Sequence, residues 1–368
     1  MKRLTLLLIP FVLLSGLKPI QTKVNNPRKP LNIILMIGDG MGLSQMSASF
    51  YFNPSTSAFG DFTHIGLVNT SSATHKVTDS GAGGTAIACG KRTYNYAIGV
   101  GLDSLPLQNI TEILSKRNYK SGIVVTCGIT HATPASFYAH AINRSENSKI
   151  AEQLLQSKID FFAGGGLKYF TARKDGKNLF KEFMQNGFTM DSVSLISPKE
   201  LKSDKKYGFL LASDELPKAR KNRGNFLPEA TVLALNYLSQ SNNGFFLMVE
   251  GSQIDWGGHD NDDKDLIAEV IDFDNAVRAA LEFAKNEGNT LVIVTADHET
   301  GGFTLAAKDA DKMDGDYDKI NPKFATNGHS ATLVPLLAYG PQANNFIGLY
   351  KNEQILEKIL SSIKMQNN

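Results

Sequence analysis

Residues 31–45, LNIILMIGDGMGLSQ, decide the fold of this chain. The apolar run 33–37 predicts a strand buried on both faces, which is typical of parallel sheets covered by helices. This run ends in Asp39, which stands between Gly38 and Gly40. Glycine is preferred where a chain turns sharply or where another group must come close. We therefore expect Asp39 either to cap a turn or to face a positive charge.

Apolar runs alternate with amphipathic helical patterns along the rest of the chain. The predicted strands are 33–37, 65–69, 122–126, 161–163, 245–250, 291–295 and 334–339. The predicted helices are 80–89, 107–117, 134–141, 148–157, 228–238, 264–285 and 352–363. This alternation predicts an α/β fold, a three-layer αβα sandwich with a large, mostly parallel central sheet and helices on both faces. We expect one domain over 31–365, with 168–225 as a surface excursion and 309–327 as a long loop.

Composition and the amino terminus restrict the setting in which the protein works. The 368 residues carry a net charge of +2, so nucleic acid is not expected as a specific partner. Lys2 and Arg3 precede an apolar run, so residues 1–22 are predicted to be a cleavable signal peptide, with a permanent anchor as the alternative. We expect a periplasmic or secreted protein that keeps no stable membrane span after processing. Cys89 and Cys127 form either a disulfide or two free buried thiols.

Carboxylates and imidazoles gather at the predicted strand ends. The residues concerned are Asp39, Glu250, Asp255, His259, Asp297, His298 and His329. In open α/β sheets, ligands bind beyond the carboxyl ends of the strands. Unpaired carboxylates at one edge would raise each other's pKa strongly. A cluster of divalent cations is the simplest resolution.

Each of these signals also has a structural interpretation. Asp255 and His259 can bind one ion from one face of a helix, although an acidic residue is also common at a helix start. Asp297 and His298 can instead form an ordinary ion pair. The turn GDGMG gives the spacing GxGxG, whereas a dinucleotide-binding turn requires GxGxxG.

Two further residues fit chemistry on an anion. Ser80 opens the predicted helix 80–89, where the helix dipole and free N–H groups favour a nucleophile that attacks an anion; a plain helix cap is the alternative. Arg144 follows Thr133 by about three helical turns. It either binds two phosphate oxygens or lies on the surface. His64, His75 and His140 have no motif around them and are interpreted as structural or exposed.

Seven motifs, taken together and in order, resemble those of the alkaline phosphatases. They are MIGDGMG (36–42), TDSGAGGTAIACG (78–90), HATPASFYAHAINR (131–144), AGGG (163–166), MVEGSQIDWGGH (248–259), TADHETGG (295–302) and GHSATLVPLLAYGP (328–341). The resemblance implies an exported enzyme that hydrolyses small-molecule phosphate monoesters through a phosphoserine, with two zinc ions and one magnesium ion. Members of the family are commonly homodimers.

The resemblance also implies a role for each matching residue. Ser80 would be the nucleophile and Arg144 would bind phosphate oxygens. One zinc would be held by Asp255, His259 and His329, and the second by Asp39, Asp297 and His298 beside Ser80. The third site, usually magnesium, would use Asp39, Thr133 and Glu250. Asp39 would thus bridge two cations.

Three positions depart from the pattern of the best-studied bacterial enzymes. His131 replaces an aspartate near the third site, which leaves the identity of that metal open. Trp256 and Gly258 replace a lysine and an aspartate that help to hold phosphate. We expect faster turnover and a higher KM, and the double change Trp256→Lys, Gly258→Asp is predicted to lower both. A phosphodiesterase or sulfatase on the same frame, or a non-catalytic phosphate-binding surface protein, are the alternative functions.

Overall fold

The computed structural model describes residues 30–309, 312 and 315–367; the predicted signal peptide lies outside the described residues. Ten strands form the main sheet, namely β1 (Asn32–Gly38), β2 (His64–Asn69), β3 (Lys120–Gly128), β4 (Phe161–Gly165), β5 (Phe188–Asp191), β6 (Lys206–Leu210), β7 (Phe245–Gly251), β8 (Thr290–Thr295), β13 (Val334–Tyr339) and β14 (Gly348–Lys351). Their order across the sheet is β14-β2-β13-β8-β1-β7-β3-β4-β6-β5. Two small sheets, β9 (Glu299–Thr300) with β12 (His329–Ser330) and β10 (Thr304–Lys308) with β11 (Asp316–Lys323), lie outside it.

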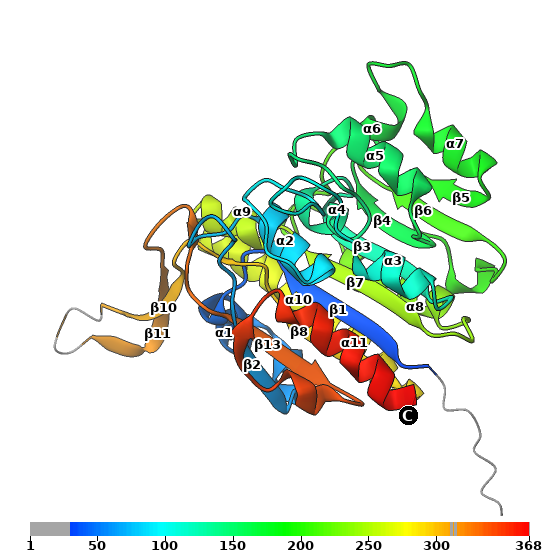
Figure 1. The fold of residues 1–368 in the computed structure, drawn as a ribbon. Coiled ribbons are helices and arrows are strands. Elements are labelled where there is room, and N and C mark those ends of the chain that lie inside the picture. The colour runs from blue at the N-terminus through cyan, green and yellow to red at the C-terminus, as the bar shows by residue number, and fades with distance from the viewer. Residues whose placement is uncertain (1–29, 310–311, 313–314, 368) are drawn as a thin grey trace, which may run out of the picture.

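Helices cover both faces of the main sheet (Figure 1). The helices are α1 (Leu43–Phe52), α2 (Ser80–Cys89), α3 (Ile110–Ser115), α4 (Ala132–Ala135), α5 (Asn147–Gln156), α6 (Lys168–Thr171), α7 (Leu179–Gln185), α8 (Phe226–Leu238), α9 (Ile254–His259), α10 (Asp263–Glu287) and α11 (Gln354–Asn367), with 3-10 turns η1 (Ala58–Asp61), η2 (Pro198–Glu200) and η3 (Ala343–Phe346). On one face α8 and α10 pack against each other and against the central strands, while α2 and α11 pack together on the other. The predicted α/β sandwich is confirmed.

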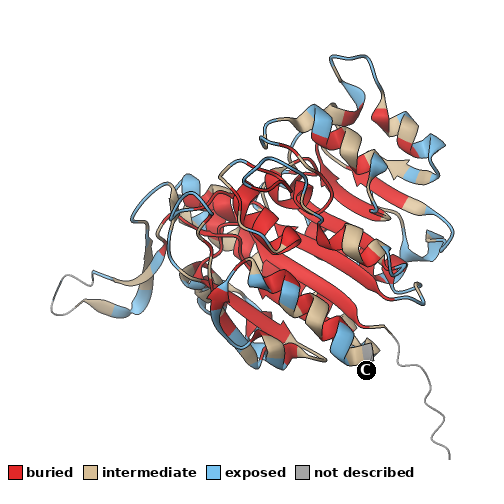
Figure 2. Cartoon of the chain, viewed as in Figure 1, coloured by how far each residue is buried: buried red, intermediate tan, exposed pale blue. Residues whose placement is uncertain are grey.

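The core lies along the central strands. Every residue of β1, β7 and β8 is buried, and Figure 2 shows the central strands in the colour of buried residues along their length. These strands read as uninterrupted apolar runs because helices remove both of their faces from water. All predicted strands are found, and the predicted helix 80–89 coincides with α2.

One strand of the main sheet runs against the others. β13 is antiparallel to β2 and β8, whereas the remaining pairs are parallel. The start of an antiparallel strand lies at the same edge as the carboxyl ends of its parallel neighbours. His329, which precedes β13, therefore reaches the same rim as Asp39.

The predicted helix 134–141 is wrong. Only α4 forms, and the chain then leaves the helix because neighbouring segments recruit its backbone: Ala141 bridges to Ile98, and the His140 N–H donates to Gln153 Oε1 at 2.8 Å. Arg144 accordingly lies in a turn and not on a helix.

Two further segments differ from expectation. The stretch 168–225 is more than a surface excursion, because its strands β6 and β5 extend the sheet beside β4. The stretch 309–327 contains β11, which pairs with β10. Both segments are polar, and the one-sided burial of an edge strand weakens the apolar pattern that predicts it. Cys89 and Cys127 are free and buried. None of the described helices combines the length and apolarity needed to cross a membrane.

Candidate active site

Strand register brings three carboxylates together at the rim. Ile37 of β1 pairs with Glu250 of β7 and with Thr295 of β8. Asp39 and Asp297 each lie two residues beyond these pairs, so both carboxylates emerge beside Glu250. All three are fully buried, with 0% relative exposure.

The glycines that flank Asp39 allow other segments to approach closely. Gly40 has a φ of +70°, and a Cβ there would lie 2.8 Å from the Cα of Asp255. A Cβ at Gly38 would lie 2.8 Å from the Cβ of Met41. Only a residue without a side chain fits these positions. The glycines thus let the end of β1 contact the start of α9.

The first group of candidate ligands is Asp255, His259 and His329. Asp255 and His259 lie on α9, and their Oδ2 and Nε2 atoms are 3.4 Å apart. His329 Nε2 is 3.5 Å from Asp255 Oδ1 and 3.1 Å from His259 Nε2. The three ligand atoms lie within 4.8 Å of one another. Oxygen and imidazole nitrogen in this arrangement suit a zinc ion.

The second group lies deeper and adjoins Ser80. His298 Nε2 is 3.5 Å from Asp39 Oδ1, 3.3 Å from Asp297 Oδ2 and 3.2 Å from Ser80 Oγ. The residues whose ligand atoms all lie within 4.8 Å of one another here are Asp39, Asp255 and His298. Asp255 therefore belongs to both groups, which places two candidate ion positions side by side.

Each of the three imidazoles is oriented by a bond to its other ring nitrogen. His259 Nδ1 is 2.7 Å from Asn327 O, and His329 Nδ1 is 2.8 Å from Thr78 O. His298 Nδ1 is 3.2 Å from Thr300 Oγ1. Such partners fix the ring and direct Nε2 toward an ion. Thr300, which also bonds Asp255 Oδ1, is a supporting residue that sequence reasoning missed.

Several buried polar atoms of the site have no hydrogen-bond partner. They are both carboxylate oxygens of Asp39, Asp297 Oδ2, Glu250 Oε1, Thr133 Oγ1 and His131 Nδ1. Buried polar groups are nearly always satisfied, so a cluster of unsatisfied acceptors indicates an absent cation. The residues present therefore fit the divalent ions that the sequence predicts.

The electrostatics of the protein alone agree with this interpretation. Burial, followed by the charges of Asp297, Asp255 and Glu250, raises the pKa of Asp39 well above its usual range. Burial also raises the pKa of Glu250 to about 7 and, with the Asp255 charge, the pKa of Asp297 to about 6. Nearby cations would reverse these shifts, because positive charge favours the ionised carboxylates.

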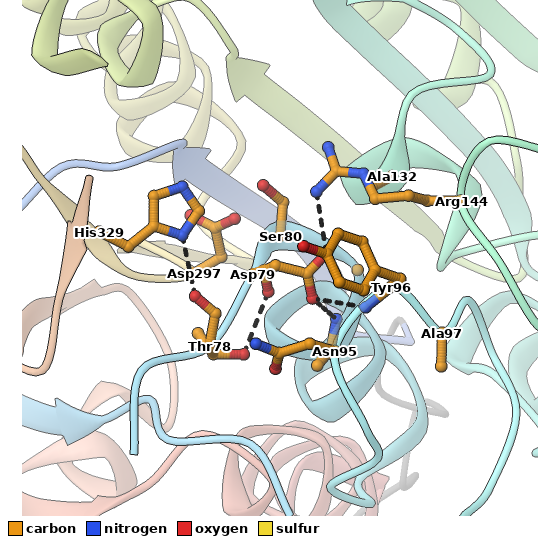
Figure 3. A network of polar contacts seen from close by, with 12 residues as sticks. Thr78, Asp79, Ser80, Asn95, Tyr96, Ala97, Ala132, Arg144, Asp297 and His329 are labelled. Atoms are coloured by element: carbon orange, nitrogen blue, oxygen red, sulfur yellow. Dashed lines mark hydrogen bonds and ion pairs between the residues drawn. The ribbon is translucent and has the colours of Figure 1, made fainter. Parts of the chain in front are cut away.

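Ser80 is the first residue of α2 and is 2% exposed. Asp79 caps this helix, since its Oδ1 accepts hydrogen bonds from Ala82 N and Tyr96 N, both at 3.0 Å. Its Oδ2 accepts from Arg144 Nη1 at 2.9 Å (Figure 3). Burial opposes ionisation of Asp79, but these bonds outweigh it and lower its pKa. Asp79 thus positions Arg144 beside the serine, a role that the sequence pattern alone does not reveal.

Two of the atypical residues lie in contact. The rings of His131 and Trp256 meet edge to face with centroids 6.1 Å apart. Gly258 has no room for a side chain, because a Cβ there would lie 2.9 Å from the backbone O of Thr300. The double change that sequence analysis suggested is therefore not a clean test, since Gly258→Asp would push α9 away from β9. By contrast, the rings of His64 and His75 bond the preceding Thr63 and Thr74, and the His140 ring bonds Gly99 O, all outside the two candidate ligand groups.

A serine at a helix amino terminus, a guanidinium beside it and two adjacent carboxylate–imidazole groups define a metal-dependent hydrolase of an anionic ester. Comparison with known proteins agrees. The family model for alkaline phosphatase matches residues 30–319. Alkaline phosphatase 4 of Bacillus subtilis is 35% identical over 350 residues, which cover 90% of this chain and 74% of that protein.

Solved structures give the same result. The alkaline phosphatase from the Antarctic bacterium TAB5 superposes with a TM-score of 0.89 at 53% identity, covering 92% of this chain and 98% of that chain. A variant of the TAB5 enzyme, with one histidine replaced by aspartate and Mg bound in its M3 site, matches with the same TM-score and identity, covering 92% and 99% of the two chains. The chain belongs to the alkaline phosphatase family and is a phosphatase that acts on phosphate monoesters.

Proposed function

We propose that the chain hydrolyses small-molecule phosphate monoesters through a phosphoserine at Ser80, with two zinc ions and one magnesium ion. The observation that carries this proposal is the 3.2 Å distance between Ser80 Oγ and His298 Nε2, beside buried carboxylates of which Asp39, Asp297 and Glu250 each keep at least one oxygen without a hydrogen-bond partner. When bound, the cations supply Lewis-acid chemistry for an in-line displacement.

The ligand sets start from the two groups described above, with Asp297 in place of Asp255 in the second. Asp255, His259 and His329 hold one zinc. Asp39, Asp297 and His298 hold the other, with Ser80 beside it; the free Oδ2 of Asp297 supports its inclusion.

The third site uses Asp39, Thr133 and Glu250, with His131 next to it. Glu250 Oε2 accepts hydrogen bonds from Ser252 Oγ at 2.6 Å and from Cys127 Sγ at 3.4 Å. This leaves Oε1 as the oxygen that is free to bind an ion. The TAB5 variants with Mg in the M3 site carry Asp or Glu in place of a histidine, so they support a metal position of this kind, while the imidazole nitrogen of His131 makes zinc a competitor for magnesium here.

Groups of the protein itself position the phosphoryl group against Ser80. The amino terminus of α2 presents N–H groups and the positive end of its dipole to the phosphoryl group. Arg144, held by Asp79, donates to phosphoryl oxygens. Ser80 Oγ bonds to phosphorus as the bond to the leaving alcohol breaks, and water then releases phosphate.

One assay tests the proposal. We expect chelator-treated protein to lose hydrolysis of nitrophenyl phosphate and to regain it with zinc plus magnesium. Ser80→Ala should abolish the phosphoenzyme while the bound zinc, measured by mass spectrometry, stays. Activity that is unaffected by chelation would contradict the proposal. Faster cleavage of bis-nitrophenyl phosphate or nitrophenyl sulfate would identify a phosphodiesterase or a sulfatase instead.

Export and assembly complete the proposal. The charged and apolar start of the chain supports a cleaved signal peptide, which amino-terminal sequencing of the mature protein would test. The surface helix α1 supports a homodimer: it carries no charged residue and exposes Phe50 by 53% and Tyr51 by 66%. Exposed apolar surface of this kind is typical of subunit contacts. Light scattering of the wild type and of Tyr51→Asp would test it.

A further inference from the structure

Tyr96 has an unusual backbone conformation beside the active site. Its φ is 74°, a value that bulky residues rarely adopt. Two hydrogen bonds hold it there: its N–H donates to Asp79 Oδ1 at 3.0 Å, and its carbonyl accepts from Arg144 N at 2.8 Å. The backbone of Tyr96 is therefore tied to the neighbour of the nucleophile and to the guanidinium residue.

The side chain of Tyr96 is exposed, although its backbone is held firmly. Its relative exposure is 58%, and in the view of Figure 3 its ring is drawn in front of Asp79, with Arg144 above it. Strained residues persist where surrounding contacts over-determine them, and they cluster at functional sites. A glycine would adopt this φ at lower cost. The backbone of Tyr96 thus anchors its exposed ring beside Asp79 and Arg144.

Two other exposed apolar residues lie on segments that are bonded to the residues just before Tyr96. Val77 is 37% exposed, and its carbonyl accepts from Asn95 Nδ2 at 3.1 Å. Ile142 is 57% exposed, and its carbonyl accepts from the Tyr94 hydroxyl at 3.4 Å. The backbones of Val77 and Ile142 are thereby bonded to the two residues that precede Tyr96. We call Val77, Tyr96 and Ile142 the apolar rim.

The apolar rim contrasts with the interior of the site. Ser80 and Arg144 face a charged phosphoryl group, with Asp79 holding Arg144. Val77 and Ile142 lie two residues before Asp79 and Arg144 in the chain, and the Tyr96 backbone bonds both, yet all three rim residues expose apolar surface to solvent. Exposed apolar side chains that adjoin a site mark the place where a ligand is covered. An aromatic ring held edge-on or face-on to another ring gains more than its buried area alone.

We propose that the apolar rim, with Tyr96 as its main contact, binds the leaving group of the substrate and favours monoesters of aromatic or extended apolar alcohols over those of small polar alcohols. This inference rests on the proposed function, because Ser80 and Arg144 must first position the phosphoryl group. Tyr96 is a specificity-determining residue and takes no part in bond making or breaking.

The test compares two substrates across two variants. For Tyr96→Gly, we expect kcat/KM on 2-naphthyl phosphate to fall about 5- to 20-fold and kcat/KM on glycerol 2-phosphate to change by less than about 3-fold. Tyr96→Phe keeps the ring and should retain the wild-type ratio between the substrates. The inhibition constant of inorganic phosphate should be equal in all three proteins, because phosphate does not reach the rim.

Three results would overturn the inference. An equal loss on both substrates would show that Tyr96 only supports Asp79 and Arg144. An unchanged rate on naphthyl phosphate would show that the ring does not touch the leaving group. If the molar mass of Tyr96→Gly, measured by light scattering, differs from that of the wild type, the apolar rim belongs to a subunit contact. A wild type that is active on neither substrate would reject the proposed function itself, which separates the two failures.

Discussion

Replacing Gly40 by alanine tests why glycine stands beside Asp39. A left-handed φ costs an alanine about 1–2 kcal/mol. The new Cβ would also lie 2.8 Å from Asp255 Cα and 2.8 Å from Thr300 Oγ1, and such overpacking costs about 1–3 kcal/mol. Together these predict a destabilisation of roughly 2–5 kcal/mol.

Gly176 is a matched control for this prediction. It has a φ of +75°, and a Cβ there meets nothing within 4 Å. Gly176→Ala therefore carries only the backbone cost of about 1–2 kcal/mol. We expect the urea unfolding midpoint of metal-free Gly40→Ala to fall further than that of Gly176→Ala. Zinc retention after dialysis should also fall in Gly40→Ala alone, because Asp255 belongs to both candidate ion groups.

Equal effects of the two replacements would refute the reasoning. If Gly40→Ala unfolded at the same urea concentration as Gly176→Ala and retained full zinc, then Gly40 would be needed for its backbone conformation alone. The contact between the end of β1 and the start of α9 would then not depend on the missing side chain.

Three further predictions concern the active site. Arg144→Ala should lower kcat/KM on nitrophenyl phosphate by about 10²–10³-fold, since each lost charge-assisted hydrogen bond is worth about 1.5–3 kcal/mol, whereas exposed Arg117→Ala should have no effect. Trp256→Lys alone should lower KM and kcat. Gly258→Asp should instead lower the urea unfolding midpoint. A wild-type midpoint for Gly258→Asp would show that α9 and β9 tolerate the side chain. For metal-free protein, burial raises the pKa of folded Glu250 to about 7, above its unfolded value, so urea stability should fall as pH rises from about 4.5 to 7; a flat profile without metal would count against this.

The sequence alone was sufficient for the central strands of the sheet and for the residue types of the site. Buried parallel strands carry a strong apolar signal, since both faces are covered, and the predicted strand 334–339 matches β13 to the residue. The sequence was less informative for strands whose burial depends on which other strands lie beside them. β5 is the edge strand of the sheet and is only partly buried, and β6, although mostly buried, is a short strand in a polar stretch, so their patterns did not distinguish them from a surface segment.

The tertiary structure decided how those residues meet. A sequence does not record that β13 runs antiparallel and so delivers His329 to the rim, nor that Arg144 reaches Asp79 from a turn. Neither does it record that Thr300 leaves no space for a side chain at Gly258. Local patterns report which face of an element is buried, because that is set within a few residues. Contacts between residues separated by two hundred positions depend on register and chain direction, and only the folded chain fixes these.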